Sequence, residues 1–109
     1  MGLTTGLWVS AQVRICDRAF IPATVVRRGD PDAGTVLLKL NRFEQGVTVY
    51  VQASSTNDEP TWSRGTGPAP VAEAEADAYI ARQVQYDPDV WVLEIEDRRG
   101  QYKLDGKIV

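Results

Sequence analysis

The sequence predicts an α/β (α+β) fold: a single compact domain over residues 1–109, with a mixed sheet and two main helices packed on it. Three observations support this prediction. The chain has 109 residues and is 43% hydrophobic, which suits one domain with a substantial core. Apolar residues recur at helical spacing twice, near the start and again after residue 70. Between and after these stretches lie short runs of β-branched and aliphatic residues, which are typical of strands.

The first element fits two patterns. Apolar residues at every second position favour a strand, and they are Leu7, Val9, Ala11, Val13 and Ile15. Apolar residues at helical spacing form a stripe as well, and they are Val9, Val13, Cys16 and Phe20. The alternation fails at Asp17 and Arg18, whereas the helical stripe continues to Phe20. We therefore predict a helix over residues 7–19, with Cys16 on its buried side.

Three predicted strands follow, at residues 23–28, 35–40 and 47–52. The segments between them, 29–34 and 41–46, carry the Gly, Pro, Asp and Asn residues that are common in turns. Short connections favour antiparallel pairing of consecutive strands. We therefore predict a three-stranded antiparallel meander.

A polar segment and a second helix come next. Residues 53–70 are rich in Ser, Thr, Asn, Asp, Gly and Pro, and we predict a mobile loop there, in which Trp62 marks a short edge strand. An amphipathic helix is predicted over residues 71–86. The Asp87-Pro88 pair ends it, because the residue before a proline avoids helical geometry.

The last part of the chain returns to extended structure. Residues 91–96 alternate as a strand, with Glu94 and Glu96 on the same face. Residues 97–100 indicate a turn. Residues 102–104 then predict a short returning strand.

Three stretches of sequence together resemble a known family. They are residues 8–11 (WVSA), residues 25–34 (VVRRGDPDAG), and residues 82–83 (RQ) with residues 86–98 (YDPDVWVLEIEDR). They resemble a family of small alphaproteobacterial proteins known as domain of unknown function 1491. The resemblance covers most of the chain but not residues 54–70. It implies an α/β fold with a helix-covered sheet, and it carries over no catalytic residue, cofactor or partner.

Composition excludes several kinds of chemistry. The chain has no histidine and a single cysteine, Cys16, which excludes Ser-His-Asp triads, Cys-His dyads, imidazole zinc sites and a disulfide within the chain. The net charge of −3 argues against nucleic-acid binding. No apolar run reaches the length of a membrane helix, and the start lacks the basic residues of a signal peptide. We expect a cytoplasmic protein without a membrane partner.

The loop at residues 29–34 is one candidate site. Its backbone amides, together with Arg27 and Arg28, could hold a phosphate or a carboxylate. The loop lacks the sequence of a P-loop or a dinucleotide fingerprint, and Asp30 and Asp32 would repel an anion. We therefore interpret it as a hairpin turn with surface arginines on its flank.

An acidic corner at residues 87–96 is the second candidate. Its carboxylates belong to Asp87, Asp89, Glu94 and Glu96. The two glutamates lie about 7 Å apart along one strand face, a spacing at which they could share a magnesium ion. Metal-dependent nucleases place a lysine where Glu96 stands. We therefore expect no metal and no cofactor, and we interpret these carboxylates as structural partners of a basic group, which could be Arg14, Lys39 or Arg82.

Trp62 stands in a polar segment, as either an exposed anchor for a partner or a hydrophobic lid. From the sequence we predict a non-catalytic binding or protein-interaction module. One alternative is a metal-dependent hydrolase that uses the acidic corner. The other is a structural subunit of an oligomer, with Trp62 in the contact. A pocket lined by Arg27, Arg28 or Arg82 would instead favour a small ligand.

Overall fold

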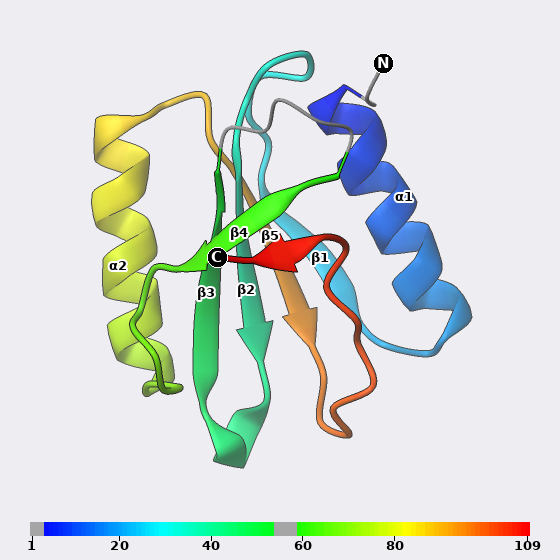
Figure 1. The fold of residues 1–109 in the computed structure, drawn as a ribbon, viewed down its shortest axis with the longest axis vertical. Coiled ribbons are helices and arrows are strands. Elements are labelled where there is room, and N and C mark those ends of the chain that lie inside the picture. The colour runs from blue at the N-terminus through cyan, green and yellow to red at the C-terminus, as the bar shows by residue number, and fades with distance from the viewer. Residues whose placement is uncertain (1–3, 54–58) are drawn as a thin grey trace.

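A computed structural model describes residues 4–53 and 59–109, and it contains a six-stranded mixed sheet with one helix on each face (Figure 1). The helices are α1 (Thr5–Arg18) and α2 (Glu73–Tyr86). The strands are β1 (Ala23–Arg27), β2 (Val36–Asn41), β3 (Val47–Ala53), β4 (Thr61–Arg64), β5 (Trp91–Glu96) and β6 (Lys107–Ile108). A single 3-10 turn, η1 (Phe43–Gln45), joins β2 to β3. The predicted α+β fold is confirmed, and so is the helical interpretation of residues 7–19.

The order of the strands in the sheet is β1-β5-β2-β3-β4-β6, so that β5 lies between β1 and β2. It pairs antiparallel with β1 and parallel with β2. The predicted meander is therefore wrong at its first pairing, and β2, β3 and β4 form the antiparallel meander instead. The physical reason is the burial of β5, whose side chains at positions 91, 92, 93 and 95 are all covered. A strand covered on both faces takes a central place in a sheet.

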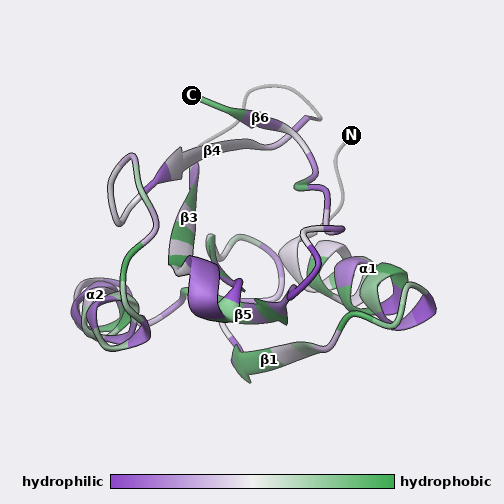
Figure 2. Ribbon diagram, turned by 90° about the horizontal axis from the view of Figure 1, so that it is seen from below, coloured by the Kyte–Doolittle hydropathy of each residue, from purple (hydrophilic) through white to green (hydrophobic). Residues whose placement is uncertain are grey.

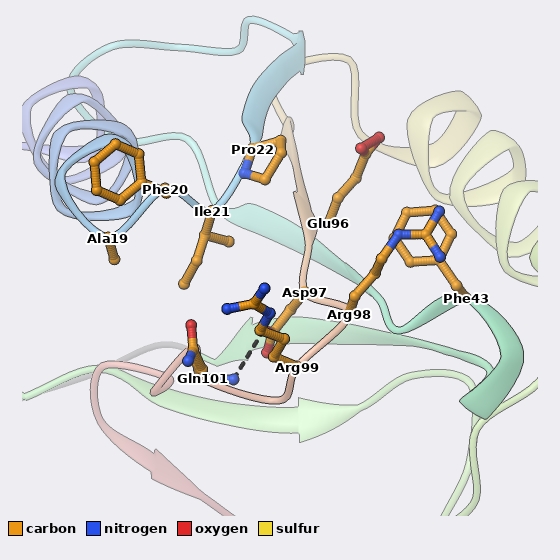
Figure 3. Close-up of a pocket in the computed structure, with 10 residues that line it drawn as sticks. All are labelled: Ala19, Phe20, Ile21, Pro22, Phe43, Glu96, Asp97, Arg98, Arg99 and Gln101. Carbon is orange, nitrogen blue, oxygen red and sulfur yellow. Dashed lines mark hydrogen bonds between the residues drawn. The ribbon is translucent and has the colours of Figure 1, made fainter.

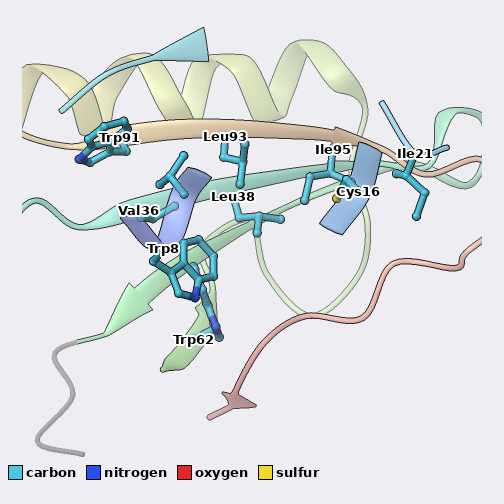
Figure 4. Close-up of a cluster of buried hydrophobic side chains, with 10 residues drawn as sticks. Trp8, Cys16, Ile21, Val36, Leu38, Trp62, Trp91, Leu93 and Ile95 are labelled. Carbon is cyan, nitrogen blue, oxygen red and sulfur yellow. The ribbon is translucent and has the colours of Figure 1, made fainter. Parts of the chain in front are cut away.

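The sheet curves around α1, with β1 at one end of the curve and β4 and β6 at the other (Figure 2). The core on this concave face contains all three tryptophans (Figure 4). Its buried members are Trp8, Val9, Cys16, Ile21, Val36, Leu38, Trp62, Trp91, Leu93 and Ile95. Trp62 is fully buried, so the exposed-anchor interpretation of this residue is wrong. Burial raises the pKa of the Cys16 thiol, and the negative charge of Asp97 raises it further, which keeps the thiol protonated.

The convex face of the sheet is covered by α2 and has a charged group at its centre. Lys39 of β2 is only 5% exposed. Its ammonium group lies 2.8 Å from carboxylate oxygens of Glu73 and Asp77 on α2, and 3.5 Å from Glu94 on β5. Burial lowers the pKa of Lys39, but the hydrogen bonds to Asp77 and Glu73 and the charge of Glu94 more than offset this effect and raise the pKa above its ordinary value. The ion pairs therefore fix α2 to the middle of the sheet.

The segment after β5 is held by the buried carboxylate of Asp97. Its two oxygens accept the backbone amides of Gln101 at 2.9 Å and Tyr102 at 3.0 Å. The Tyr102 hydroxyl donates to Gln12 of α1, and burial raises the pKa of Tyr102. The predicted strand at residues 102–104 is wrong, because these residues pack across the concave core instead of pairing with a strand, and β6 forms further along.

Asp105 closes this concave core. Its carboxylate accepts the indole N–H of Trp8 at 2.8 Å, and its backbone carbonyl accepts that of Trp62 at 2.7 Å. The two indole rings lie 5.5 Å apart at a tilted angle. Both buried N–H groups therefore have partners, which removes the free-energy cost of leaving them unbonded.

Part of the predicted loop at residues 53–70 is regular structure. Ala53 ends β3, and β4 occupies residues 61–64, as the position of Trp62 indicated. Residues 54–58 of the predicted loop lie outside the described residues. Of the two helices in the described ranges, neither is both long and apolar enough to cross a bilayer.

We expect Lys39→Met to lower the free energy of unfolding by about 1–3 kcal/mol at neutral pH, because it leaves the half-buried carboxylate of Glu94 without its cation. Glu73 and Asp77 are more exposed, so water compensates for much of their loss. A raised lysine pKa contributes stability that is complete below the unfolded-state pKa and is lost only as the pH rises through the folded-state pKa. Urea unfolding should therefore show a difference that stays constant from pH 6 to 9. Lys103→Met, at an exposed position, serves as the control. An unchanged urea midpoint for Lys39→Met would contradict this prediction.

We expect Asp97→Asn to lower the free energy of unfolding by about 1.5–3 kcal/mol, because an amide group offers one acceptor oxygen where the carboxylate offers two. Amide hydrogen exchange at Gln101 and Tyr102 should accelerate more than at other residues. Asp32→Asn, on an exposed side chain, is the matched control. Equal stability of the Asp97 variant and the wild type would show that the two hydrogen bonds contribute little.

Candidate functional site

The two loops that carry the sequence resemblance meet just before the start of β5. The amide of Asp30 donates to the carbonyl of Asp89 at 2.9 Å. A Cβ atom on Gly29 or Gly34 would overlap the same carbonyl, so only glycine allows this close approach. The glycines of residues 29–34 therefore serve the packing of the two loops.

Three backbone amides of residues 29–34, those of Asp30, Ala33 and Gly34, are bonded within the protein. The Asp30 carboxylate accepts the amide of Ala33 at 2.8 Å, and the Asp30 carbonyl accepts the amide of Gly34 at 3.1 Å. Arg27 donates to the carbonyl of Pro88 at 2.8 Å, although its Nε atom is buried without a partner. Amides that are already bonded do not form an anion cradle, so this geometry favours the structural interpretation.

Tryptophan and arginine complete the junction of these loops. The indole N–H of Trp91 donates to the carbonyl of Asp30 at 2.7 Å. The guanidinium group of Arg28 lies over the Trp91 ring, 5.4 Å from its centroid. Arg27, Arg28 and Asp30 are thus brought together, and each contacts another part of the chain.

The acidic corner is divided among three places. The Asp87 carboxylate accepts the amide of Asp89 at 3.0 Å, which is a local turn. Glu94 faces Lys39 on the convex side. Glu96 lies at the opposite end of β5. Across the described ranges there is no group of three or more cysteines or carboxylates that could hold a metal ion.

The other two predicted residues lie apart from these loops. Arg82 stands on α2 with its guanidinium group 6.0 Å from the Tyr79 ring centroid. Trp62 is inside the concave core. Both are distant from Arg27 and Arg28 in sequence. Among the described residues, neither forms a hydrogen bond, an ion pair or a ring contact with those arginines.

The cleft that the structure favours as a site lies elsewhere, beyond the carboxyl ends of the parallel strands β2 and β5. Its volume is about 590 Å³. Residues that follow α1, β2 and β5 line it, and they are Ala19, Phe20, Ile21, Pro22, Phe43, Glu96, Asp97, Arg98, Arg99 and Gln101 (Figure 3). Ligands of open α/β sheets commonly bind at the carboxyl ends of parallel strands. We refer to these ten residues as the phenylalanine–arginine cleft.

Two phenylalanines of this cleft adopt left-handed backbone conformations. Both Phe20 and Phe43 have a φ of 59°, and every other described residue with positive φ is a glycine. Phe20 follows the helix cap, where the amide of Ile21 donates to the carbonyl of Cys16, a position at which glycine is favoured. Its side chain is nevertheless 94% exposed. Phe20 therefore costs conformational energy without contributing burial to the core.

The charges of the cleft are arranged on two sides of a turn. The guanidinium group of Arg98 lies 3.8 Å from the ring centroid of Phe43. Figure 3 shows Arg99 extending the opposite way, toward Ile21 and Gln101. Neither arginine forms an ion pair with another residue in the described ranges. The cleft therefore presents two guanidinium groups without ion-pair partners in the described ranges, and one of them, that of Arg98, lies against an aromatic ring.

Sequence reasoning missed most of this cleft. It placed Phe20 at the end of an apolar helix stripe, Phe43 in a turn, and Arg98 and Arg99 in another turn. The available signal was a phenylalanine where a helix ends just before Pro22. Only the return of the chain after β5 brings that position next to the Arg98-Arg99 turn. Of the predicted candidates, Glu96 alone lines the cleft.

The side chains that line the cleft include few of the groups used in covalent chemistry. Among the described residues that line it there is no serine, threonine, cysteine, lysine or tyrosine. The Asp97 carboxylate is occupied by two backbone amides, which leaves Glu96 as the one carboxylate of the cleft that has no hydrogen-bond or ion-pair partner among the described residues. A nucleophile with an adjacent base is absent from these lining residues, so the geometry does not assemble covalent catalysis.

Comparisons with known proteins agree with the sequence resemblance. The family model described as "Protein of unknown function (DUF1491)" matches residues 3–105. A DUF1491 family protein from Caulobacter crescentus CB15 has a crystal structure that is 36% identical in sequence with a TM-score of 0.83, and the match covers 100% of this chain and 99% of that one. An NMR structure of a DUF1491 family protein from the same organism gives the same identity and TM-score and covers 98% of that chain.

A third solved structure, that of a protein from A. tumefaciens, is 24% identical in sequence with a TM-score of 0.72, and the match covers 88% of this chain and 86% of that one. At this identity the match shows a similar fold and nothing more. No curated protein matches the chain. The family model spans nearly all of the sequence, and the Caulobacter crescentus relative is similar over its whole length. The chain therefore belongs to the DUF1491 family, whose function is unknown.

Proposed function

We propose that this protein is a non-catalytic protein-interaction module that binds its partner in the phenylalanine–arginine cleft. The observation that carries the proposal is Phe20, an aromatic side chain that is 94% exposed on a backbone position with a φ of 59°. Exposed aromatic residues beside arginines are the side chains that most often supply binding energy at protein interfaces. A residue that is unfavourable for the isolated fold gains a physical role when a partner covers it.

The chemistry of the cleft indicates what the partner presents. Phe20, Ile21 and Pro22 offer an apolar surface on one side. Arg98 and Arg99 offer guanidinium groups on the other, and a carboxylate is the group that a guanidinium binds in paired hydrogen bonds. The proposed ligand is therefore a segment of another protein in which an acidic residue stands next to an apolar one.

A phage-displayed library of random linear peptides tests this function. The library is selected on the immobilised wild-type protein after depletion on a Phe20→Gly/Arg99→Gln double variant. We expect the enriched peptides to share an acidic residue beside an apolar one. A synthetic peptide of that sequence should shift the amide resonances of Phe20, Phe43 and Arg98.

The control for this selection is Tyr86→Ser, which removes an equally exposed aromatic side chain outside the cleft. It should bind the selected peptide as tightly as the wild type does. Selection that enriches no sequence, peptides that bind the double variant equally well, or resonance shifts confined to residues outside the cleft would each refute the proposed function.

We expect Phe20→Gly alone to raise the free energy of unfolding by about 0.5–1 kcal/mol. Glycine adopts the left-handed conformation without steric cost, and this gain exceeds the extra chain entropy that glycine loses on folding. Urea unfolding followed by tryptophan fluorescence measures the change. A clear loss of stability would show that Phe20 packs against the fold and would remove the main support for the cleft.

A further inference from the structure

The strand β1 has an unpaired edge. It is the first strand in the sheet order, and it pairs with β5 on one side only. Figure 2 shows β1 at the rim of the sheet with no other strand beyond it. An exposed edge of this kind presents backbone N–H and C=O groups that can pair with another strand.

The register of β1 identifies which backbone groups point outward. The carbonyl of Pro22 accepts the amide of Glu96 at 2.9 Å, so Pro22 faces β5. In an antiparallel pair, residues alternate between facing the partner strand and facing away from it. Ala23 and Val25 therefore direct their N–H and C=O groups to the free edge. A bulge between Val25 and Arg27 ends this regular stretch.

A groove of about 560 Å³ runs beside this edge, between α1 and β1. Its apolar lining includes Val13, Ile21 and Val25. Two charged residues of α1 also line it, Arg14 and Asp17. Neither forms an ion pair with another residue in the ranges that the structure describes.

We propose that β1 pairs antiparallel with the β1 strand of a second copy of this chain, around a two-fold axis at Thr24. In this register Ala23 faces the partner's Val25, and Val25 faces the partner's Ala23, so that all four outward N–H and C=O groups of each copy are bonded.

Charge complementarity favours a second copy over an unrelated peptide. Arg14 and Asp17 are three positions apart, so they lie on one face of α1, and they carry opposite charges. A two-fold axis reverses their order, which brings Arg14 toward the partner's Asp17 and Asp17 toward the partner's Arg14. An interface formed by the same patch on both copies needs this kind of self-complementarity. The dimer does not depend on the function proposed for the cleft.

Sedimentation equilibrium over a wide range of protein concentration tests the dimer. We expect a monomer–dimer equilibrium in which Arg14→Asp or Asp17→Arg alone raises the dissociation constant about tenfold or more, because like charges then face each other. The Arg14→Asp/Asp17→Arg double variant exchanges the charges and should restore the affinity. Arg18→Asp, also on α1 but outside the groove, should leave it unchanged.

Two further measurements locate the interface. Val25→Pro removes an outward amide that has no partner among the described residues, so it should abolish the dimer while the monomer still folds. In the wild type, amide exchange at Ala23 and Val25 should slow as the concentration rises. A monomer at every concentration, a dimer that survives Val25→Pro, or a double variant that fails to restore affinity would each overturn the proposal. Protection of these amides in a monomer by an added peptide would also overturn it, because the edge would then bind a different partner.

Discussion

The buried residue Asp97 connects the paired strands β2 and β5 to the turn that presents the arginines of the cleft. Its own amide donates to the carbonyl of Asn41 at 2.8 Å, which extends the pairing of β5 with β2. Its side chain then fixes the turn that displays Arg98 and Arg99, and it directs the following residues over the concave core. The arginines of the cleft are therefore positioned by a carboxylate whose two oxygens each accept a backbone amide. Few charged side chains are buried in proteins without such complete pairing.

Local patterns in the sequence were sufficient to predict most of the helices and strands but not the order of the strands in the sheet. Helical spacing up to Cys16 and the β-branched runs identified α1 and the strands, because those patterns reflect which side chains are buried. The order of the sheet depends on a strand that is distant in sequence. Residues 28–35 are short enough for a hairpin connection, yet they cross the start of β5 and pack on Asp89 instead. Connection length alone does not distinguish these two paths.

The candidate site was harder to predict than the fold because its residues come from three separate turns. Glu94 stood out in the sequence as an acidic residue on a strand, and Lys39 was one of three basic residues that could have reached it, but only the structure shows that Lys39 is its partner. Phe20 read as part of an apolar stripe, because the backbone angle that turns it outward leaves no trace in composition. Sequence patterns report burial along one element, and a cleft arises from the spatial relation of several elements.

The central place of β5 also has a consequence for the order of events during synthesis. Roughly 60 residues separate β1 from β5, and at typical rates of translation they take about 3–12 s to make. The meander of β2, β3 and β4 can pair as it emerges, since its strands are close in sequence. During that interval β1 has no strand to pair with, and the side of β2 that later joins β5 stays open. Until β5 has been made, the edges of β1 and β2 that later join it therefore lack their partner strand, and the sheet cannot be completed.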